Sequence, residues 1–158
     1  METKQLATER RARFTTLVSG VLVACVLLPA AAHHSFAMYD REAVRTLTGK
    51  LTRFVPSANH AQFYFELLGP DGAVVMENGK PVVWGAETGP AATLAKRGVT
   101  GQSFPLGSII TVNVHPLRDG RTFGVLAQER EFVIKCGTKL PAGGCTRDTG
   151  QVFDGLSN

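Results

Sequence analysis

Residues 60–68 alternate between apolar and polar side chains, and this alternation constrains the fold more than any other feature of the sequence. One face would carry apolar side chains and the other polar ones: Ala61, Phe63, Phe65 and Leu67 against His60, Gln62, Tyr64 and Glu66. A strand with one buried face has this period of two, whereas a helix repeats every 3.6 residues. The segment therefore predicts a half-buried β-strand.

Other segments with the same period follow along the chain, separated by turn residues. Residues 44–54 place Leu47 and Leu51 on one face. The Asn78-Gly79 pair suits the positive φ of a tight hairpin turn. The further predicted strands cover residues 73–76, 81–86, 108–114 and 122–134. In the strand 108–114 and the residue after it, apolar side chains alternate with polar ones: Ile110, Val112 and Val114 against Thr111, Asn113 and His115.

One short helix is predicted over residues 90–98, because Pro90 opens the segment, basic residues end it and Gly98 closes it. The helix falls between the third and fourth strands of the domain. That order predicts a mainly β domain, a small OB-like five-stranded barrel over residues 44–136. The alternative is a small open sandwich, for which this helix position is less natural. The tail, residues 137–158, is turn-rich, and its last part has too few apolar residues to predict firm packing.

The N-terminus has the features of an export signal. Basic residues precede an uncharged apolar stretch over residues 14–28, and Ala30-Ala31-Ala32 follows it. This pattern predicts a signal peptide over residues 1–32, cut after Ala32, and a periplasmic or secreted product. Removing 32 of the 158 residues leaves 126, enough for one domain.

Three other interpretations of the leader stay open. The first is a retained anchor helix, although the apolar stretch is shorter than the usual membrane span. The second is a lipoprotein signal that would place a lipid on Cys25 and tether the chain to a membrane. The third is a twin-arginine signal, which Arg10-Arg11 matches only weakly.

The net charge bears on which partners the protein can bind, and the cysteine content bears on its covalent structure. The whole chain carries +4, and residues 1–32 contribute four basic and two acidic side chains, which leaves +2 on the mature part. Nucleic acid is therefore not an expected partner. Cys136 and Cys145 remain after cleavage and predict a disulfide, worth about 2–3 kcal/mol through loop closure. The alternative is two free thiols.

A family resemblance begins where the mature chain would begin. Residues 33–40 read His33-His34-Ser35-Phe36-Ala37-Met38-Tyr39-Asp40. Further matching positions run to about Ala127: Gly49, Ala58-Asn59-His60-Ala61, Trp84, Glu87, Leu94, Gly98, Gly107 and the turn from Pro116 to Gly120. In these positions the sequence resembles an uncharacterised family of small exported bacterial proteins whose mature chains open with His-His-Ser-Phe and carry an Asn-Pro-His element. The resemblance implies export and an approximate fold, but no reaction.

The sequence departs from that family in three places. Ala58-Asn59-His60 lacks the proline of the Asn-Pro-His element, the hairpin over residues 77–80 is longer, and the cysteine pair lies outside the shared region. Any role that depends on the geometry of the proline-containing loop is therefore in doubt.

All four histidines survive the predicted cleavage: His33, His34, His60 and His115. If the cut follows Ala32, the α-amine and imidazole of His33 form a bidentate chelate that suits Cu(II). If it follows Ala31, the second histidine stands at position three and again favours square-planar Cu(II) or Ni(II). His60 and His115 lie on polar strand faces, near strand ends, so either could complete the site.

The alternative is an undocked N-terminal arm over residues 33–43 and two solvent-exposed loop histidines. Against it, the large side chains of Phe36, Met38 and Tyr39 would favour docking of the arm on the barrel. Three acidic residues could orient a metal-binding histidine: Glu66, Glu87 and Asp119.

No hydrolase or nucleotide-binding motif is present in the sequence. We therefore expect a non-catalytic binding module for a small ligand or an envelope protein, with copper as the most testable ligand. One alternative is a copper-dependent redox enzyme that uses the N-terminal histidine. Another is an envelope interaction module that binds peptide or glycan on its second and third strands.

Overall fold

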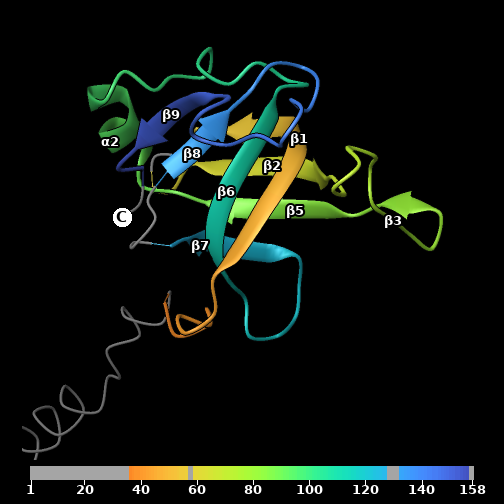
Figure 1. Cartoon of the computed structure of the whole chain (residues 1–158). Coiled ribbons are helices and arrows are strands. Elements are labelled where there is room, and N and C mark those ends of the chain that lie inside the picture. Colours follow the sequence, from red (N-terminus) through yellow and green to blue (C-terminus); the bar gives the residue numbers. More distant parts are fainter. Residues whose placement is uncertain (1–35, 57–58, 128–131, 157–158) are drawn as a thin grey trace, which may run out of the picture. The chain divides into compact units, whose positions relative to one another are not determined.

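Five strands close into a barrel in the computed structural model, which describes residues 36–56, 59–127 and 132–156. They are β1 (Arg45–Val55), β2 (Gln62–Leu67), β5 (Val83–Glu87), β6 (Ile109–Pro116) and β7 (Phe123–Leu126). Their order around the barrel is β1-β2-β5-β7-β6, and β6 pairs back onto β1 (Figure 1). Only the β5–β7 pair among these is parallel. The helix α2 (Ala91–Lys96) lies between the third and fourth barrel strands. The OB-like barrel is thus confirmed, and the open sandwich is excluded.

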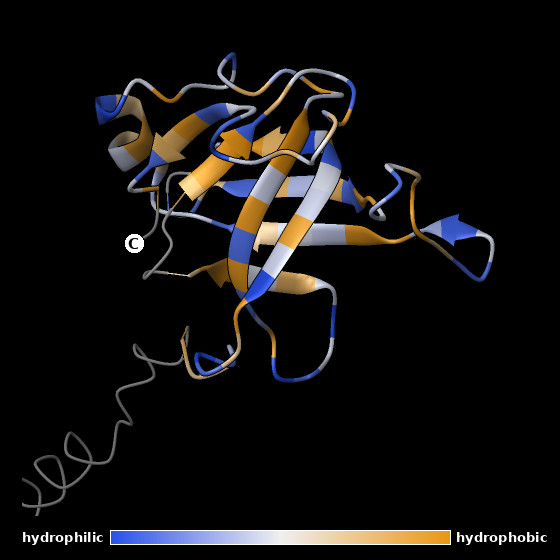
Figure 2. Cartoon of the chain, viewed as in Figure 1, coloured by the Kyte–Doolittle hydropathy of each residue, from blue (hydrophilic) through white to orange (hydrophobic). Residues whose placement is uncertain are grey.

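The apolar side chains of the alternating segments fill the interior of the barrel. Phe63 and Phe65 are completely buried and Leu51 is 1% exposed. Hydrophobic and hydrophilic positions alternate along β1 and β6 (Figure 2). The strands form because this period of two puts one set of side chains into a shared core.

The short helix ends as its sequence predicts. Gly98 adopts φ 75°. Its N–H bonds the carbonyl of Ala95 at 3.0 Å, and the N–H of Val99 bonds the carbonyl of Leu94 at 2.9 Å. This pair of bonds satisfies the last helical carbonyls, and Leu94 and Val99 pack into the core beside each other.

The predicted hairpin forms a separate two-stranded ribbon. Its strands, β3 (Met76–Glu77) and β4 (Lys80–Pro81), extend away from the barrel (Figure 1). Asn78 and Gly79 have φ values of 51° and 76°, so the turn prediction is confirmed. The bounds of the strands predicted over 73–76 and 81–86 are wrong. Only residue 76 of the first lies in a strand, and the second is divided between β4 and the third barrel strand, which starts at Val83.

The single long strand predicted over residues 122–134 is wrong. The structure has β7 and then β8 (Phe132–Lys135), both on the same side of β6. Leu126 pairs with Val114, so an unbroken ladder would set residue 128 opposite Val112; Val133 holds that place, five residues later. The insertion shifts the phase of the alternation, because Leu126 and Val133 both lie in the main core although they are seven positions apart. Apolar side chains occupy both faces of β8, Val133 on one and Phe132 and Ile134 on the other, so the sequence of this strand does not show the shift.

The tail packs more firmly than its composition indicates. Its strand β9 (Gln151–Asp154) pairs with β8, and Leu156 is completely buried. The carbonyl of Leu156 accepts a hydrogen bond from Gly89 at 2.6 Å. The predicted disulfide between Cys136 and Cys145 is present, with Cα atoms 5.9 Å apart.

Residues 37–158 form one compact unit. The predicted signal peptide and its alternatives fall outside the described residues. Within the part of the chain that the structure describes, no helix is long and apolar enough to cross a bilayer.

Candidate functional site

Strand pairing places a row of side chains on the outer face of the barrel. Gln62 pairs with Glu87, Glu87 with Val125, and Val125 with His115. Paired residues on neighbouring strands point to the same side of a sheet. Their chain neighbours Phe63, Ala86, Leu126 and Val114 fill the core, so these four residues face outward. We call Gln62, Glu87, Val125 and His115 the outer row.

Glu87 is the acidic centre of this row. Its Oε1 lies 3.4 Å from Nδ1 of His60, and its carboxylate accepts a hydrogen bond from the hydroxyl of Tyr39. Burial raises the pKa of Glu87 above its ordinary value of 4.5, while His60 and the Tyr39 hydroxyl act in the opposite direction. Burial, followed by the charge of Glu87 and the hydrogen bond to it, raises the pKa of Tyr39 to about 12.

Tyr39 fastens the start of the described chain to this face. It forms an isolated β-bridge with Leu117, is 3% exposed, and packs against Leu117 and Val125. The next residue continues the attachment, since Asp40 N–H bonds the carbonyl of Pro116 at 2.8 Å. Docking of the arm is therefore confirmed for Tyr39.

Docking is wrong for Met38, one of the other two large side chains near the terminus. Phe36 and Met38 are 37% and 46% exposed. Composition alone could not distinguish them from Tyr39, which also has a hydroxyl for Glu87.

His115 is buried rather than solvent-exposed. It is 2% exposed, and its Nδ1 donates a hydrogen bond to the carbonyl of Ala43 at 2.8 Å. The alternative of a solvent-exposed loop histidine is therefore wrong for His115. β6 has paired neighbours on both sides, and the Ala43 carbonyl lies against the ring.

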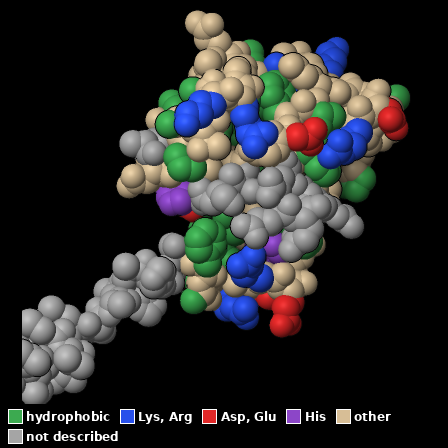
Figure 3. Space-filling model, turned by 90° about the vertical axis from the view of Figure 1, so that its left-hand side faces the viewer, with side chains coloured by type: hydrophobic (Ala, Val, Ile, Leu, Met, Phe, Trp, Pro, Cys, Tyr) green, Lys and Arg blue, Asp and Glu red, His purple; other side chains and the backbone are tan. Residues whose placement is uncertain are grey.

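His60 and His115 share an orientation that suits metal binding. Each ring has its Nδ1 beside an oxygen that can accept a hydrogen bond, the Glu87 carboxylate or the Ala43 carbonyl. With Nδ1 protonated, the lone pair of a neutral imidazole lies on Nε2. Metal-binding histidines use this arrangement, in which a carboxylate or carbonyl orients the ring. Figure 3 shows histidine side chains on one face of the molecule.

The other predicted acidic partners do not join the row. Asp119 contacts Arg121, with Oδ2 2.8 Å from Nε, and hydrogen bonds from Arg121 lower its pKa. Glu66 pairs with Lys50 and Val83, at the opposite end of β2 from His60.

His33 and His34 lie outside the described residues. In the sequence, His33 precedes Tyr39 by six positions. Among the described residues, no three His, Cys, Asp or Glu side chains cluster as a metal site. The described part of the chain thus contributes two oriented imidazoles rather than a complete set of ligands.

Comparison with known proteins gives a family but no activity. No curated protein and no solved structure matches the chain. The model of a family of unknown function, DUF6152, matches residues 21–128, which includes every residue of the outer row. The chain therefore belongs to this family of unknown function.

Proposed function

We propose that the protein is exported, begins at His33 after cleavage, and acts as a non-catalytic module that binds Cu(II). The α-amine and imidazole of His33 form the primary chelate. Nε2 of His60 or of His115 completes it. Nitrogen ligands in a tetragonal arrangement are those that Cu(II) prefers.

The attachment of Tyr39 carries this proposal. It ties the chain six residues after His33 to the same outer face that holds Glu87 and both internal histidines. A free N-terminal arm would lose conformational entropy on joining a folded site, and a nearby anchor reduces that cost. His34 stands beside His33 and takes its place as the key ligand if cleavage follows Ala31.

Three further features support export. The Cys136–Cys145 disulfide is typical of proteins in oxidising compartments. The family resemblance, in which mature chains open with His-His-Ser-Phe, supports a cleavage site before His33. The N-terminal leader has the basic, apolar and small-residue segments of a signal peptide.

Intact mass of the exported protein tests the first half of the proposal. The expected mass corresponds to a chain from His33 with one disulfide. Retention of Met1, or a lipid on Cys25, would remove the free amine and overturn the copper site.

Cu(II) titration followed by electron paramagnetic resonance tests the second half. The reference is a synthetic peptide of residues 33–39, which carries the same chelate without the barrel. We expect the folded protein to bind at least about tenfold more tightly than the peptide, a difference of about 1.4 kcal/mol. His60→Ala or His115→Gln should remove that advantage and change the spectrum. Equal affinity and identical spectra for protein, variants and peptide would exclude a folded site.

The same preparation distinguishes the redox alternative. A copper enzyme would convert added reductant and oxygen to peroxide faster than the same concentration of the copper-loaded peptide. A binding module would not exceed the peptide.

A further inference from the structure

A groove lies on the outer face of β1, β6 and β8, separate from the outer row. Its volume is about 460 Å³, within the range of small-molecule sites. Its floor consists of uncharged polar side chains from two paired strands: Thr46, Thr48, Thr111 and Asn113. Thr111 and Asn113 are only 5% and 2% exposed. The little surface that these two side chains expose faces the groove.

The floor residues hold one another in place across the strand pair. Thr46 Oγ1 donates to Asn113 Oδ1 at 2.6 Å. Thr48 Oγ1 and Thr111 Oγ1 lie 2.8 Å apart, so one hydroxyl donates to the other. One hydroxyl proton of that pair and the amide group of Asn113 remain as donors for a ligand. The floor is therefore ordered before any ligand binds.

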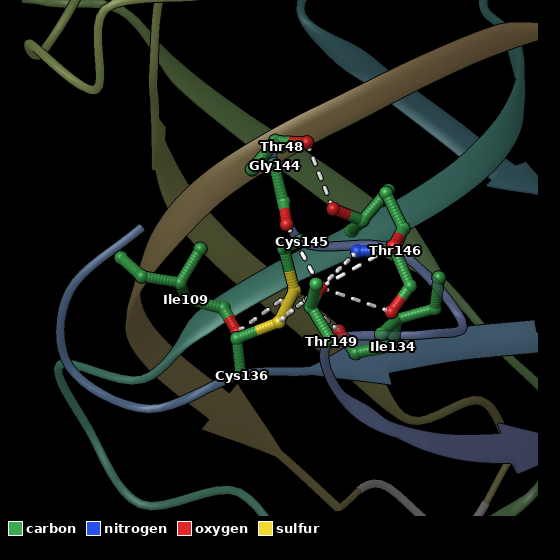
Figure 4. The surroundings of a disulfide bond; sticks show 9 residues. Thr48, Ile109, Ile134, Cys136, Gly144, Cys145, Thr146 and Thr149 are labelled. Atoms are coloured by element: carbon green, nitrogen blue, oxygen red, sulfur yellow. Dashed lines mark hydrogen bonds between the residues drawn. A yellow bond between two sulfur atoms is a disulfide. The ribbon is translucent and has the colours of Figure 1, made fainter. Parts of the chain in front are cut away.

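The disulfide loop contributes Gly144, Cys145 and Thr146 to the rim of the groove. Figure 4 shows the contacts of this loop. Cys145 is joined to Cys136 at the end of β8. Thr149 Oγ1 donates to the carbonyl of Gly144 at 2.8 Å and accepts from the N–H of Thr146 at 2.8 Å. These contacts fix the loop residues that face the floor.

The opposite wall is apolar, and the charges at its edge balance. Phe132 and Ile134 of β8 form this wall. One residue of each sign lines this edge, Arg147 and Asp148. Arg147 also lies 4.1 Å above the Phe132 ring and 3.3 Å from Asp154. The groove therefore favours an uncharged ligand that has both hydrogen-bonding and apolar parts.

A second hollow continues the groove across β1. It measures about 260 Å³ and shares Thr46, Thr48 and Gly144 with the first. Its other side is apolar, with Leu67, Pro70 and Leu140. Two adjoining hollows with common residues suit a chain of repeated units rather than a single compact molecule.

From these features we propose that the groove binds a neutral oligosaccharide bearing N-acetyl groups. Sugar hydroxyls can exchange hydrogen bonds with the threonines of the floor, and the acetamide can pair with the Asn113 side chain. The acetyl methyl groups and the C–H faces of the rings fit the apolar walls. This surface is not the one predicted from the sequence, where the alternative was a glycan bound on the second and third strands.

The test is titration of the full mature protein with the tetrasaccharide of N-acetylglucosamine, followed by amide chemical shifts. We expect saturable binding with a Kd of about 1 mM or tighter. The shifted amides should lie at residues 46–48, 111–113 and 144–148. Shifts confined to other residues, or no saturation, would overturn the proposal.

Matched variants make the test specific. The double variant Thr48→Val, Thr111→Val replaces both members of one hydrogen-bonded pair by isosteres, so no buried partner is left unpaired. It should weaken binding at least about tenfold. Thr52→Val removes a hydroxyl from the same face of β1 outside the groove and should bind like the wild type. If the double variant does not fold, the shift map of the wild type decides.

The tetrasaccharide of glucose, which lacks acetamide groups, tests the ligand class. It should bind at least about tenfold more weakly. Equal binding would overturn the assignment of the acetamide to Asn113. None of these measurements involves copper, so they succeed or fail independently of the metal site.

Discussion

At the scale of single residues, a hydrogen bond between Tyr39 and Glu87 is one of the connections between the start of the described chain and the barrel. Their contact joins residues 48 positions apart in the numbering, through a hydroxyl and a partly buried carboxylate. Each group changes the ionisation of the other, because both lie where water solvates a charge poorly.

Replacing Tyr39 by Phe should raise the pKa of Glu87 further. The hydroxyl stabilises the carboxylate, and its removal leaves the effect of burial less opposed. The measurement is an NMR titration of the Glu87 side-chain carbonyl in protein freed of metal by EDTA. Tyr64→Phe is the control, since that hydroxyl bonds Gln62 rather than Glu87. An unchanged Glu87 titration in Tyr39→Phe would contradict the hydrogen bond.

Glu87 should also make stability depend on pH. Its pKa is higher in the folded protein than in the unfolded chain, so between these values the folded state binds more protons. The stabilisation that Glu87 contributes is therefore fully present below about pH 4.5, and it is lost as the pH rises through the pKa that Glu87 has in the folded protein. Urea unfolding of metal-free protein measures this effect. The free energy of unfolding of Glu87→Gln minus that of the wild type should increase as the pH rises over this window. A constant difference would disprove the shift.

At the scale of elements, turn and cap residues do what their types predict, while strand lengths depend on neighbouring strands. Pro90 and Gly98 bracket α2, and Asn78-Gly79 forms the hairpin turn. By contrast, the register of β8 against β6 divides the long alternating segment in two. Local conformational preferences act within a few residues, whereas register requires the partner strand.

Gly98→Ala should destabilise the protein by about 1 kcal/mol, because alanine is strained at φ 75°. No atom lies within 4 Å of the added methyl group, so the cost is conformational only. Gly101→Ala is a matched control: its site is equally open and its φ lies outside the strained region. Thermal or urea unfolding of both variants gives the comparison. Equal stability of the two would show that the left-handed cap is not required.

At the scale of the whole molecule, the C-terminal segment completes the barrel domain rather than trailing from it. Leu156 belongs to the main core cluster together with Phe63, Leu94 and Val133. Its carbonyl also accepts the Gly89 N–H, just before α2. Core residues of β2, α2 and β8 therefore share one cluster with the last residues of the described chain.

Leu156→Ala should lower the free energy of unfolding by about 2–5 kcal/mol, because it opens a cavity in the core. Leu106→Ala makes the same chemical change at a side chain that is 66% exposed and should have little effect. Urea unfolding monitored by Trp84 fluorescence should show one transition for both. A small effect of Leu156→Ala, or a separate early transition, would mean that the tail is not part of the cooperative unit.

The sequence alone determined features that arise from local chemistry. Alternation indicated which faces of β1 and β2 are buried, proline and glycine indicated the helix ends, and the two cysteines left after the leader indicated the disulfide. Only the tertiary structure decided the burial of His115, the packing of Leu156 and the groove on β1 and β6. Thr46 and Asn113 are 67 residues apart, and they meet only once the register of their strands is set. Burial and contact at such separations depend on which distant segment covers a face, and one strand's own pattern carries no information about that segment.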